Sequence, residues 1–408
     1  PNTDRTPRYA VTDLGTLGGT FSAAFAINNR GNVAGAANLP SENQHAFLRR
    51  DGQMSDLGTL GGSNSNEGGL NERDELAIFS QTAQNDPYNE NFCGFSTDSN
   101  LICLGGVWKN GKMSPLPTLG GNNATAFAIN NKGQVAGFAE TDTMDKSCVA
   151  PQVFDFEAAM WEPNGAVHEL PPLPGDTVGF ALWLNDLGQA VGSSGTCANT
   201  VLVPLASGSH AVLWEKDSSA TYLGSLGGTM IDVAAGNNDI GEVDGCSDLA
   251  SEILGFPGVQ CHAFLWTKQT GMKDIGTVAT DFSALPTSIN NHGQMVGSSC
   301  DSSGNCRAFL RQNQQMRDLN SLIPADSPLY LLFGEDINEA GEIVGLGLET
   351  STGDVHAFLA TPCDQNHPDT EWCRNGESAE RPMIMAPENA RRLIQEQLAR
   401  RYHMGMRH

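Results

Sequence analysis

Residues 129–137 read INNKGQVAG, and nearly the same phrase occurs as INNRGNVAG at 27–35 and as INNHGQMVG at 289–297. Each copy consists of an apolar strand end, an Asn-Asn-x-Gly turn and a second short apolar run, which is the composition of a tight β-hairpin. Four looser copies complete the set: LNERDELAI (70–78), LNDLGQAVG (184–192), NNDIGEVDG (237–245) and INEAGEIVG (337–345). The chain therefore contains seven related hairpins.

A second signature follows each hairpin. Its seven copies are HAFLR (45–49), GGVWK (105–109), AAMWE (158–162), HAVLW (210–214), HAFLW (262–266), RAFLR (307–311) and HAFLA (356–360). Most of them continue through a polar turn into a short strand such as MSDLG (54–58), so each unit offers four strands. The turn positions 31, 74, 133, 188, 241, 293 and 341 are 43, 59, 55, 53, 52 and 48 residues apart. Four strands in about 45 to 50 residues is typical of a propeller blade, and we predict an all-β, seven-bladed β-propeller.

The two ends of the repeat region complement each other. The seventh unit stops after HAFLATPC (356–363) without its fourth strand, and RYAVTDLG (8–15) matches the strand that is missing. Because an uncovered sheet edge invites association, we expect the N-terminal strand to close the ring. The predicted organisation is a propeller over 1–362, a disulfide-stapled exit segment over 363–380 and a basic helical tail over 381–408.

Composition narrows the class of partner. Only 17% of the residues are charged and 46 are Gly, which favours short strands and tight turns. The net charge of -24 argues against nucleic acid and anionic lipid as partners of the body, and favours cations or basic partners. Since no run of eighteen apolar residues exists, we expect no transmembrane segment. The first residues also lack the pattern of a signal peptide, which leaves a cytosolic chain or one whose leader has been removed.

The ten cysteines favour the second of these alternatives. No C-x-x-C pair occurs among them, so structural disulfides in a secreted protein explain them better than zinc or thioredoxin-like chemistry. Pairing by proximity joins Cys93 with Cys103, Cys148 with Cys197, Cys246 with Cys261, Cys300 with Cys306, and Cys363 with Cys373.

Together, DLGTLGG (13–19), the AINNxGQVxG phrase and HAFLW resemble the HAF-repeat family of predicted extracellular bacterial proteins. The resemblance covers about residues 8–361. It implies a secreted, propeller-like repeat protein and no common activity.

Strand order separates the loops into two groups. If strands A to D run outward, the tight A–B and C–D turns lie on one face, and the B–C and D–A loops lie on the other. The B–C insertions at about 79–104, 139–156, 193–209 and 246–261 carry most of the cysteines. Their face is either a recognition surface, since loops on rigid scaffolds often carry function, or a set of exposed loops that need disulfides outside the cell.

The inner strands offer a second candidate site. We align the residues that stand two positions before the turn Asn of each repeat, and we call this set the hub column. Its members are Ala26, Gly69, Ala128, Trp183, Ala235, Ser288 and Asp336. Small residues suit a crowded hub, and Trp183 and Asp336 depart from that pattern. With Glu67, Asp232 and Glu335, they are candidates to hold a sugar or a cation at a channel mouth by stacking and through carboxylates, calcium being the fitting ion. The alternative is that these side chains fill gaps between irregular blades.

Other chemically suggestive residues follow the repeat. Because His45, His210, His262 and His356 share one repeat position in separate blades, we interpret them as structural. Trp108, Trp161, Trp214 and Trp266 are expected in the core for the same reason. The sequence contains no HExxH, G-x-S-x-G, Walker or EF-hand motif, so no catalytic residue is assigned, although a pair of scattered acids could still form a glycosidase or lyase site.

The tail differs from the rest of the chain. Residues 381–408 carry a net charge of +4, against -28 for the remainder, and 387–402 reads as an amphipathic helix. The candidate assembly residues are Arg391, Arg392, Leu393, Ile394, Leu398, Arg400, Arg401 and Tyr402. The apolar stripe could dock on its own propeller, on a second copy or on a membrane surface. The opposite charges of tail and body favour the second copy.

Two functional hypotheses result. The first is a secreted, non-enzymatic structural or adhesive propeller whose tail joins copies of itself, with filaments as one form of assembly. The second is a propeller that binds or acts on glycans through its disulfide-rich face. Regular repeats without catalytic motifs favour the first.

Overall fold

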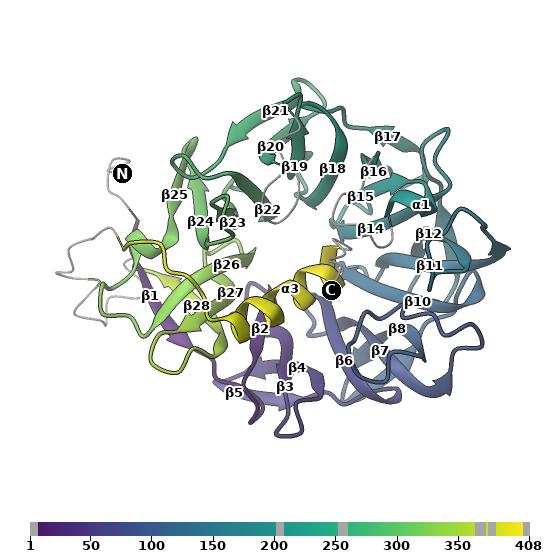
Figure 1. Ribbon diagram of the computed structural model, residues 1–408, viewed down its shortest axis with the longest axis horizontal. Helices are drawn as coiled ribbons and strands as arrows, with labels where there is room; N and C mark the ends of the chain where they lie inside the picture. Colours follow the sequence, from purple (N-terminus) through teal and green to yellow (C-terminus); the bar gives the residue numbers. More distant parts are fainter. Residues whose placement is uncertain (1–6, 201–207, 252–259, 364–372, 374–380, 403–408) are drawn as a thin grey trace.

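The computed structural model describes residues 7–200, 208–251, 260–363, 373 and 381–402. Within them, seven four-stranded antiparallel sheets surround one axis, as Figure 1 shows. The protein is the seven-bladed β-propeller that the repeats predict.

The first four blades follow the chain, with their strands given from the hub outward. Blade 1 contains β2 (Ser22–Ile27), β3 (Val33–Asn38), β4 (Gln44–Arg50) and β5 (Gln53–Asp56). Blade 2 contains β6 (Gly61–Leu70), β7 (Leu76–Asn85), β8 (Leu101–Lys109) and β9 (Lys112–Pro115). Blade 3 contains β10 (Gly120–Ile129), β11 (Val135–Met144), β12 (Phe154–Trp161) and β13 (Val167–Leu170). Blade 4 contains β14 (Val178–Leu184), β15 (Ala190–Gly195), β16 (His210–Trp214) and β17 (Ala220–Tyr222).

The other three blades include the one that closes the ring. Blade 5 contains β18 (Gly227–Asn237), β19 (Glu242–Leu249), β20 (Cys261–Thr267) and β21 (Gly271–Gly276). Blade 6 contains β22 (Ser283–Ile289), β23 (Met295–Cys300), β24 (Cys306–Gln312) and β25 (Gln315–Asp318). Blade 7 contains β26 (Leu329–Ile337), β27 (Ile343–Glu349), β28 (Val355–Pro362) and β1 (Tyr9–Asp13). The described helices are α1 (Cys197–Thr200), the 3-10 helix η1 (Leu319–Leu322) and α3 (Glu388–Tyr402).

The N-terminal strand closes the ring, as expected. β1 pairs antiparallel with β28 from Tyr9 opposite Pro362 to Asp13 opposite Phe358. The His356 side chain reaches across this pairing, with its Nδ1 2.8 Å from Asp13 Oδ2. The outer edge of blade 7 is therefore covered by a strand that comes from the other end of the chain.

The repeated turn has a local cause. Asn28 Oδ1 accepts hydrogen bonds from the backbone N–H groups of Arg30 and Asn32, and Gly31 has a φ of 73°. Glycine adopts this left-handed conformation without steric cost, and Asp, which tolerates it, takes the same position in blade 2 as Asp74, with a φ of 57°. A residue that tolerates the left-handed conformation, three positions after the Asn, is therefore a backbone requirement of each hairpin.

The register of the inner strands shows that one residue of the predicted hub column was assigned to the wrong position. In blade 1 the register shifts between Ala24 and Ala26, and in blade 5 it shifts between Ala234 and Gly236. Gly236, and not Ala235, is therefore the blade 5 equivalent of Ala26. The prediction of Ala235 was wrong by one position because NNDIGEVDG begins with two Asn residues where the other copies begin with Ile or Leu.

All five predicted disulfides are present, and none of the described cysteines is free. The pairs are Cys93–Cys103, Cys148–Cys197, Cys246–Cys261, Cys300–Cys306 and Cys363–Cys373. Apart from its two cysteines, the predicted exit segment 363–380 lies outside the described residues.

The histidines and tryptophans of the repeat are structural, as expected. The Nδ1 atoms of His45, His210, His262 and His356 lie 2.8–3.0 Å from Asp oxygens. Three of these aspartates are on the adjacent outer strand, and His210 instead contacts Asp176. The repeat tryptophans Trp108, Trp161, Trp214 and Trp266 are buried.

The tail folds back onto its own propeller. Helix α3 lies across one face of the ring (Figure 1), and Ala386, Ala390 and Ile394 are buried in the hydrophobic cluster at the hub. Arg381 donates to the backbone oxygens of Leu329 and Ser327. Leu393 packs against the same cluster, Arg391 is half-buried and Arg392 is exposed next to Glu396. The side chains of Leu398, Arg400, Arg401 and Tyr402 lie outside the described residues. The preference for a second copy as the docking site of this stripe is thus corrected for its described part, since an apolar stripe docks on the nearest complementary surface.

Candidate functional site at the hub

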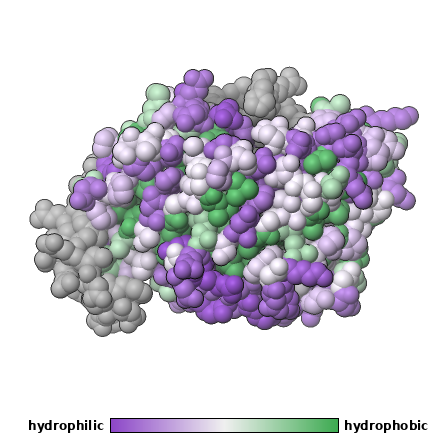
Figure 2. Space-filling model, turned by 90° about the horizontal axis from the view of Figure 1, so that it is seen from below, coloured by the Kyte–Doolittle hydropathy of each residue, from purple (hydrophilic) through white to green (hydrophobic). Residues whose placement is uncertain are grey.

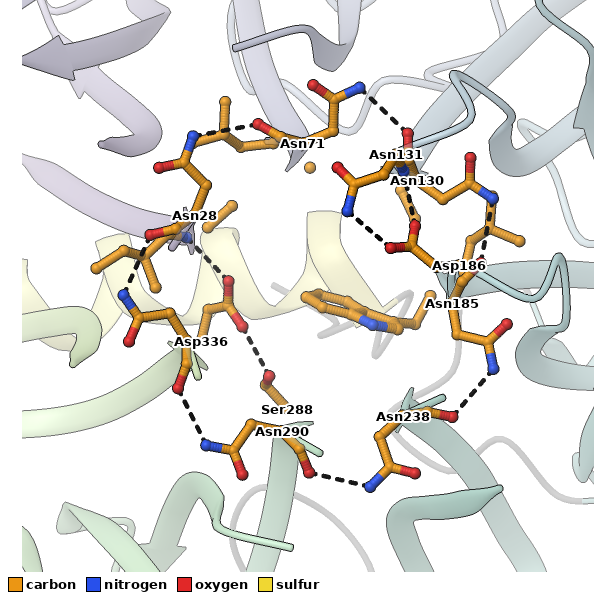
Figure 3. A pocket seen from close by; sticks show the side chains of 18 of the residues that line it. Asn28, Asn71, Asn130, Asn131, Asn185, Asp186, Asn238, Ser288, Asn290 and Asp336 are labelled. Carbon is orange, nitrogen blue, oxygen red and sulfur yellow. Dashed lines mark hydrogen bonds between the residues drawn. The ribbon is translucent and has the colours of Figure 1, made fainter. Parts of the chain in front are cut away.

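The hub carries a closed ring of asparagines at the A–B turns. In each blade the Asn side chain donates its Nδ2–H to the backbone oxygen of the corresponding Asn in the next blade, at 3.0–3.2 Å, and blade 7 donates to blade 1. Figure 3 shows these bonds. The members are Asn28, Asn71, Asn130, Asn185, Asn238, Asn290 and Asn338. One side chain therefore shapes its own turn and also joins neighbouring blades.

The next residue of each turn forms a second closed ring nearer to solvent. Its backbone N–H donates to a side-chain oxygen of the corresponding residue in the following blade, at 2.7–3.1 Å. The members are Asn29, Glu72, Asn131, Asp186, Asp239, Asn291 and Glu339. Sequence reasoning assigned these Asn-rich phrases to turns and missed both rings, although an Asn at the first position of all seven turns was the available signal.

A cavity of about 170 Å³ lies inside the rings. Trp183 of β14 and Asp336 of β26 line it together with the turn residues. Its described lining contains five acidic residues and no Lys, Arg or His. The acidic members are Glu72, Asp186, Asp239, Asp336 and Glu339. The cavity is thus polar, with one aromatic wall and a negative charge.

Asp336 is held in a fixed position. Its Oδ2 accepts from the backbone N–H of Ile27 at 2.9 Å, and its Oδ1 accepts from Ser288 Oγ at 2.7 Å (Figure 3). The carboxylate thereby joins blade 7 to blades 1 and 6. Hydrogen bonds to the ionised form stabilise a buried carboxylate, so Asp336 has a structural task in addition to lining the cavity.

The other three predicted binding residues do not line the cavity. Glu67 and Glu335 are buried in the inner strands, with 0% and 2% exposure. Asp232 is buried in the middle of β18, where burial raises its pKa to about 7. Of the five candidates, the structure therefore brings together only Trp183 and Asp336. The other three were grouped with them by chain proximity, but the pleat and twist of the strands carry their side chains elsewhere.

The far end of the hub is closed by apolar side chains. Phe25, Phe127, Leu182 and Phe333 belong to the hydrophobic cluster that also holds α3. Helix α3 covers the side of the B–C loops, because it packs beside Cys306 and Pro387 lies against Gly353. The cavity consequently opens on the side of the tight A–B turns and not on the disulfide-rich side. The carbohydrate hypothesis, which combined Trp183 with the disulfide-rich face, is corrected on this point.

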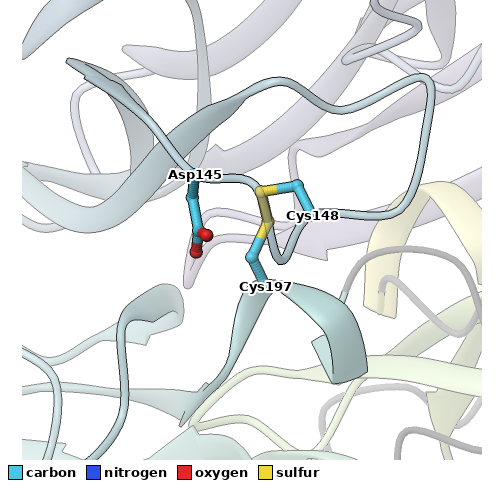
Figure 4. Close-up of side chains that lie close together, drawn as sticks. All are labelled: Asp145, Cys148 and Cys197. Carbon is cyan, nitrogen blue, oxygen red and sulfur yellow. A yellow bond between two sulfur atoms is a disulfide. The ribbon is translucent and has the colours of Figure 1, made fainter.

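A cluster of one carboxylate and two cysteines is no metal centre. Asp145 lies beside Cys148 and Cys197 (Figure 4), but the two sulfur atoms are bonded to each other. A disulfide supplies no thiolate ligand, so this group links the loops of blades 3 and 4. A calcium site at the hub stays a prediction.

Buried acids between blades 2 and 3 are also structural. Glu140 accepts from the backbone N–H groups of Asn122 and Asn123, and Glu90 accepts from Val153 and Phe154. Burial and the neighbouring Glu90 raise the pKa of Glu140 to about 7. These carboxyl groups satisfy backbone donors of the long blade 2 and blade 3 loops.

A groove of about 410 Å³ between blades 1 and 2 is a weaker candidate. Its charged residues are already paired: Arg50 lies 3.3 Å from Asp74, and Arg73 lies 2.5 Å from Glu75. Its aromatic residue, Trp108, is buried in the repeat core. The groove therefore has less free polar surface than the hub.

The outer surface shows no comparable feature in the view of Figure 2, where hydrophobic residues form small separate patches among hydrophilic ones. Among the described residues, none of the helices is long and apolar enough to cross a membrane.

Comparison with known proteins agrees with the fold. No family model and no curated protein matches the chain. Among solved structures, the β-propeller domain of the Trilobed protease from Pyrococcus furiosus is similar over 89% of this chain and 98% of its own, with 11% identity and a TM-score of 0.47. Acylaminoacyl peptidase from Pyrococcus horikoshii matches 80% of this chain at 13% identity and a TM-score of 0.45, and this chain covers 49% of that enzyme.

SapL1 lectin in complex with alpha methyl fucoside is similar over 74% of this chain and 95% of its own, with 10% identity and a TM-score of 0.40. At these identities the likeness concerns the fold alone. The seven sheets of the chain itself place it in the class of β-propeller proteins.

Proposed function

We propose that the protein is a secreted, non-catalytic propeller that binds carbohydrate in the hub cavity. The observation that carries this proposal is that Trp183 and Asp336, taken from different blades, line one polar cavity inside two rings of side-chain amides and carboxylates.

The chemistry of a sugar suits this lining. A sugar ring has an apolar face, which stacks on an indole, and hydroxyl groups, which donate to and accept from fixed polar groups. The Asn and Asp side chains of the rings are preorganised by their bonds to neighbouring blades, so their orientation costs no additional entropy on binding.

Secretion is part of the proposal. Five disulfides with no free cysteine among the described residues fit an oxidising compartment. Membership of the HAF-repeat family agrees with this reading and is proposed on the repeat motifs alone.

Self-association through the tail, which the sequence favoured as the function, is not the function proposed from the structure. It rested on the opposite charges of tail and body, but the described part of the apolar stripe, Ala390 and Ile394, is buried on its own propeller. The described tail therefore leaves no large apolar face for a second copy to cover.

The test is a glycan array with the full-length chain and a Trp183→Leu variant. We expect at least one glycan class to be retained by the wild type, and at least a tenfold loss of affinity in the variant, because leucine keeps bulk but offers no flat face. Met144→Ser, at a 54% exposed position on the B–C side, is the matched control and should bind like the wild type. Absence of binding, or binding that ignores Trp183, would refute the proposal.

A further inference from the structure

The rim of the hub cavity is chemically asymmetric. The third turn residue is basic in blades 1 to 3, where it is Arg30, Arg73 or Lys132, but it is apolar in blades 4 and 5. There, Leu187 is 49% exposed and Ile240 is 64% exposed. They follow the acidic ring members Asp186 and Asp239, in the blade that carries Trp183 and the blade after it. On this side the cavity is lined by an indole and carboxylates, and the exposed apolar side chains belong to the residues that directly follow Asp186 and Asp239 in the chain.

In the second ring, the hydrogen bond that Asp239 accepts does not require a negative charge. Asn29, Asn131 and Asn291 accept the same backbone hydrogen bond through an amide oxygen. At position 239 an Asp therefore contributes nothing to the ring that Asn does not, apart from charge, whereas Asp186 also accepts from Asn131 Nδ2 through its Oδ2 at 2.7 Å. Asp239 uses Oδ1 for this bond, and among the described residues no protein group donates to its Oδ2.

In blade 5, the side-chain oxygen of Asn237 also lacks a hydrogen-bond donor. Asn237 replaces the Ile or Leu of the other six copies, lines the cavity and is 4% exposed. Its Nδ2 donates to Gln189, but its Oδ1 accepts no hydrogen bond in the described part of the chain. A buried acceptor without a donor lowers the stability of the fold, so packing alone does not explain the polar side chain in blade 5.

We propose that the ligand is a glycan with free, protonated amino groups, whose ammonium group lies between Asp186 and Asp239 beside Trp183. The indole receives the apolar face of this sugar, and Leu187 and Ile240 lie outside it, where the next sugar of an oligomer would contact them. An ammonium group supplies three donors and a positive charge, which matches an acidic lining without a basic residue and permits a cation–π contact with the indole. A bare metal ion would bind the carboxylates but would make no contact with Leu187 and Ile240. This inference rests on the proposed carbohydrate function and names its ligand class.

The amino group can be tested with two ligands of the same skeleton. Isothermal titration of the full-length protein with glucosamine oligomers and with N-acetylglucosamine oligomers of equal length should show at least tenfold tighter binding of the amine. The preference should shrink as added salt screens the charges. It should vanish when the pH is raised until the amine is neutral.

One charge-removing variant locates the contact. Asp239→Asn retains the ring bond, as Asn131 and Asn291 do, and it should lower affinity for the amine about tenfold while leaving the N-acetyl oligomer unaffected. The control is Asp51→Asn, on a turn of the same face. It removes an equal charge, and Asn110 adopts the same backbone conformation at the equivalent turn, with a φ of 51° against 50°.

The outcomes separate the two proposals. Equal, Trp183-dependent affinity for both oligomers overturns the inference and leaves the carbohydrate function standing. Amine binding that Asp51→Asn weakens as much as Asp239→Asn also overturns it, because the effect would then be one of net charge. If neither oligomer nor any other glycan binds, both proposals are refuted.

Discussion

At the scale of single residues, the repeated Asn and Gly explain both the turn and the hub. Asn28 fixes its own hairpin through Oδ1 and reaches blade 2 through Nδ2. The sequence predicted the first of these roles, because the Asn-x-x-Gly spacing is a local signal. The second needs the neighbouring blade, which local spacing does not contain.

Gly241 allows the backbone requirement to be measured. It has a φ of 87°, and a Cβ built on it meets no atom within 4 Å, so Gly241→Ala adds conformational strain without a clash. We expect a loss of about 1–2 kcal/mol in the free energy of unfolding, measured by denaturant titration. Gly241→Asn should lose less, since Asn tolerates the left-handed region. Equal losses for both substitutions would contradict this explanation.

At the scale of elements, closure of the ring depends on β1 and on a charged pair at its end. The hydrogen bond to Asp13 raises the pKa of His356. Burial alone would raise the pKa of Asp13, but hydrogen bonds from His356 and the backbone of Gly15 lower it below 3.8. The folded state therefore favours the charged form of both partners.

The pH dependence of this pair follows from the two shifts. The contribution of His356 is complete below its ordinary pKa of 6.5 and is lost as the pH rises through the raised value. The contribution of Asp13 is present above 3.8 and is lost as the pH falls through the lowered value. We expect Asp13→Asn to destabilise the fold most near pH 5 to 6 and progressively less toward pH 9, in thermal melts across that range. A difference from the wild type that stays constant with pH would argue against the pair.

At the scale of the whole molecule, the propeller has a polar open end and an apolar covered end. The tail supplies the cover, with Ala390 and Ile394 buried against the hub and Arg381 bonded to the backbone before and within β26. The predicted alternatives for the tail were all compatible with its amphipathic sequence. Only the position of an apolar hub surface decides among them.

Removal of residues 381–408 tests this arrangement. The truncated chain should melt at a lower temperature and should associate, because the apolar surface around Leu332 and Phe333 becomes exposed, while the full-length chain should be monomeric. Light scattering after gel filtration distinguishes the two cases. A full-length oligomer that truncation converts into a stable monomer would instead restore self-assembly through the tail.

The sequence by itself determined the blade number, the closing strand, the disulfide pairs and the structural histidines, because each depends on spacing that recurs with every blade or on cysteines close in the chain or in adjacent loops. Tertiary structure alone decided that Trp183 and Asp336 share a cavity, that Glu67, Asp232 and Glu335 do not, and where the tail docks. These are contacts between segments far apart in the chain. Their geometry depends on how seven twisted sheets meet at one axis, which no single repeat encodes.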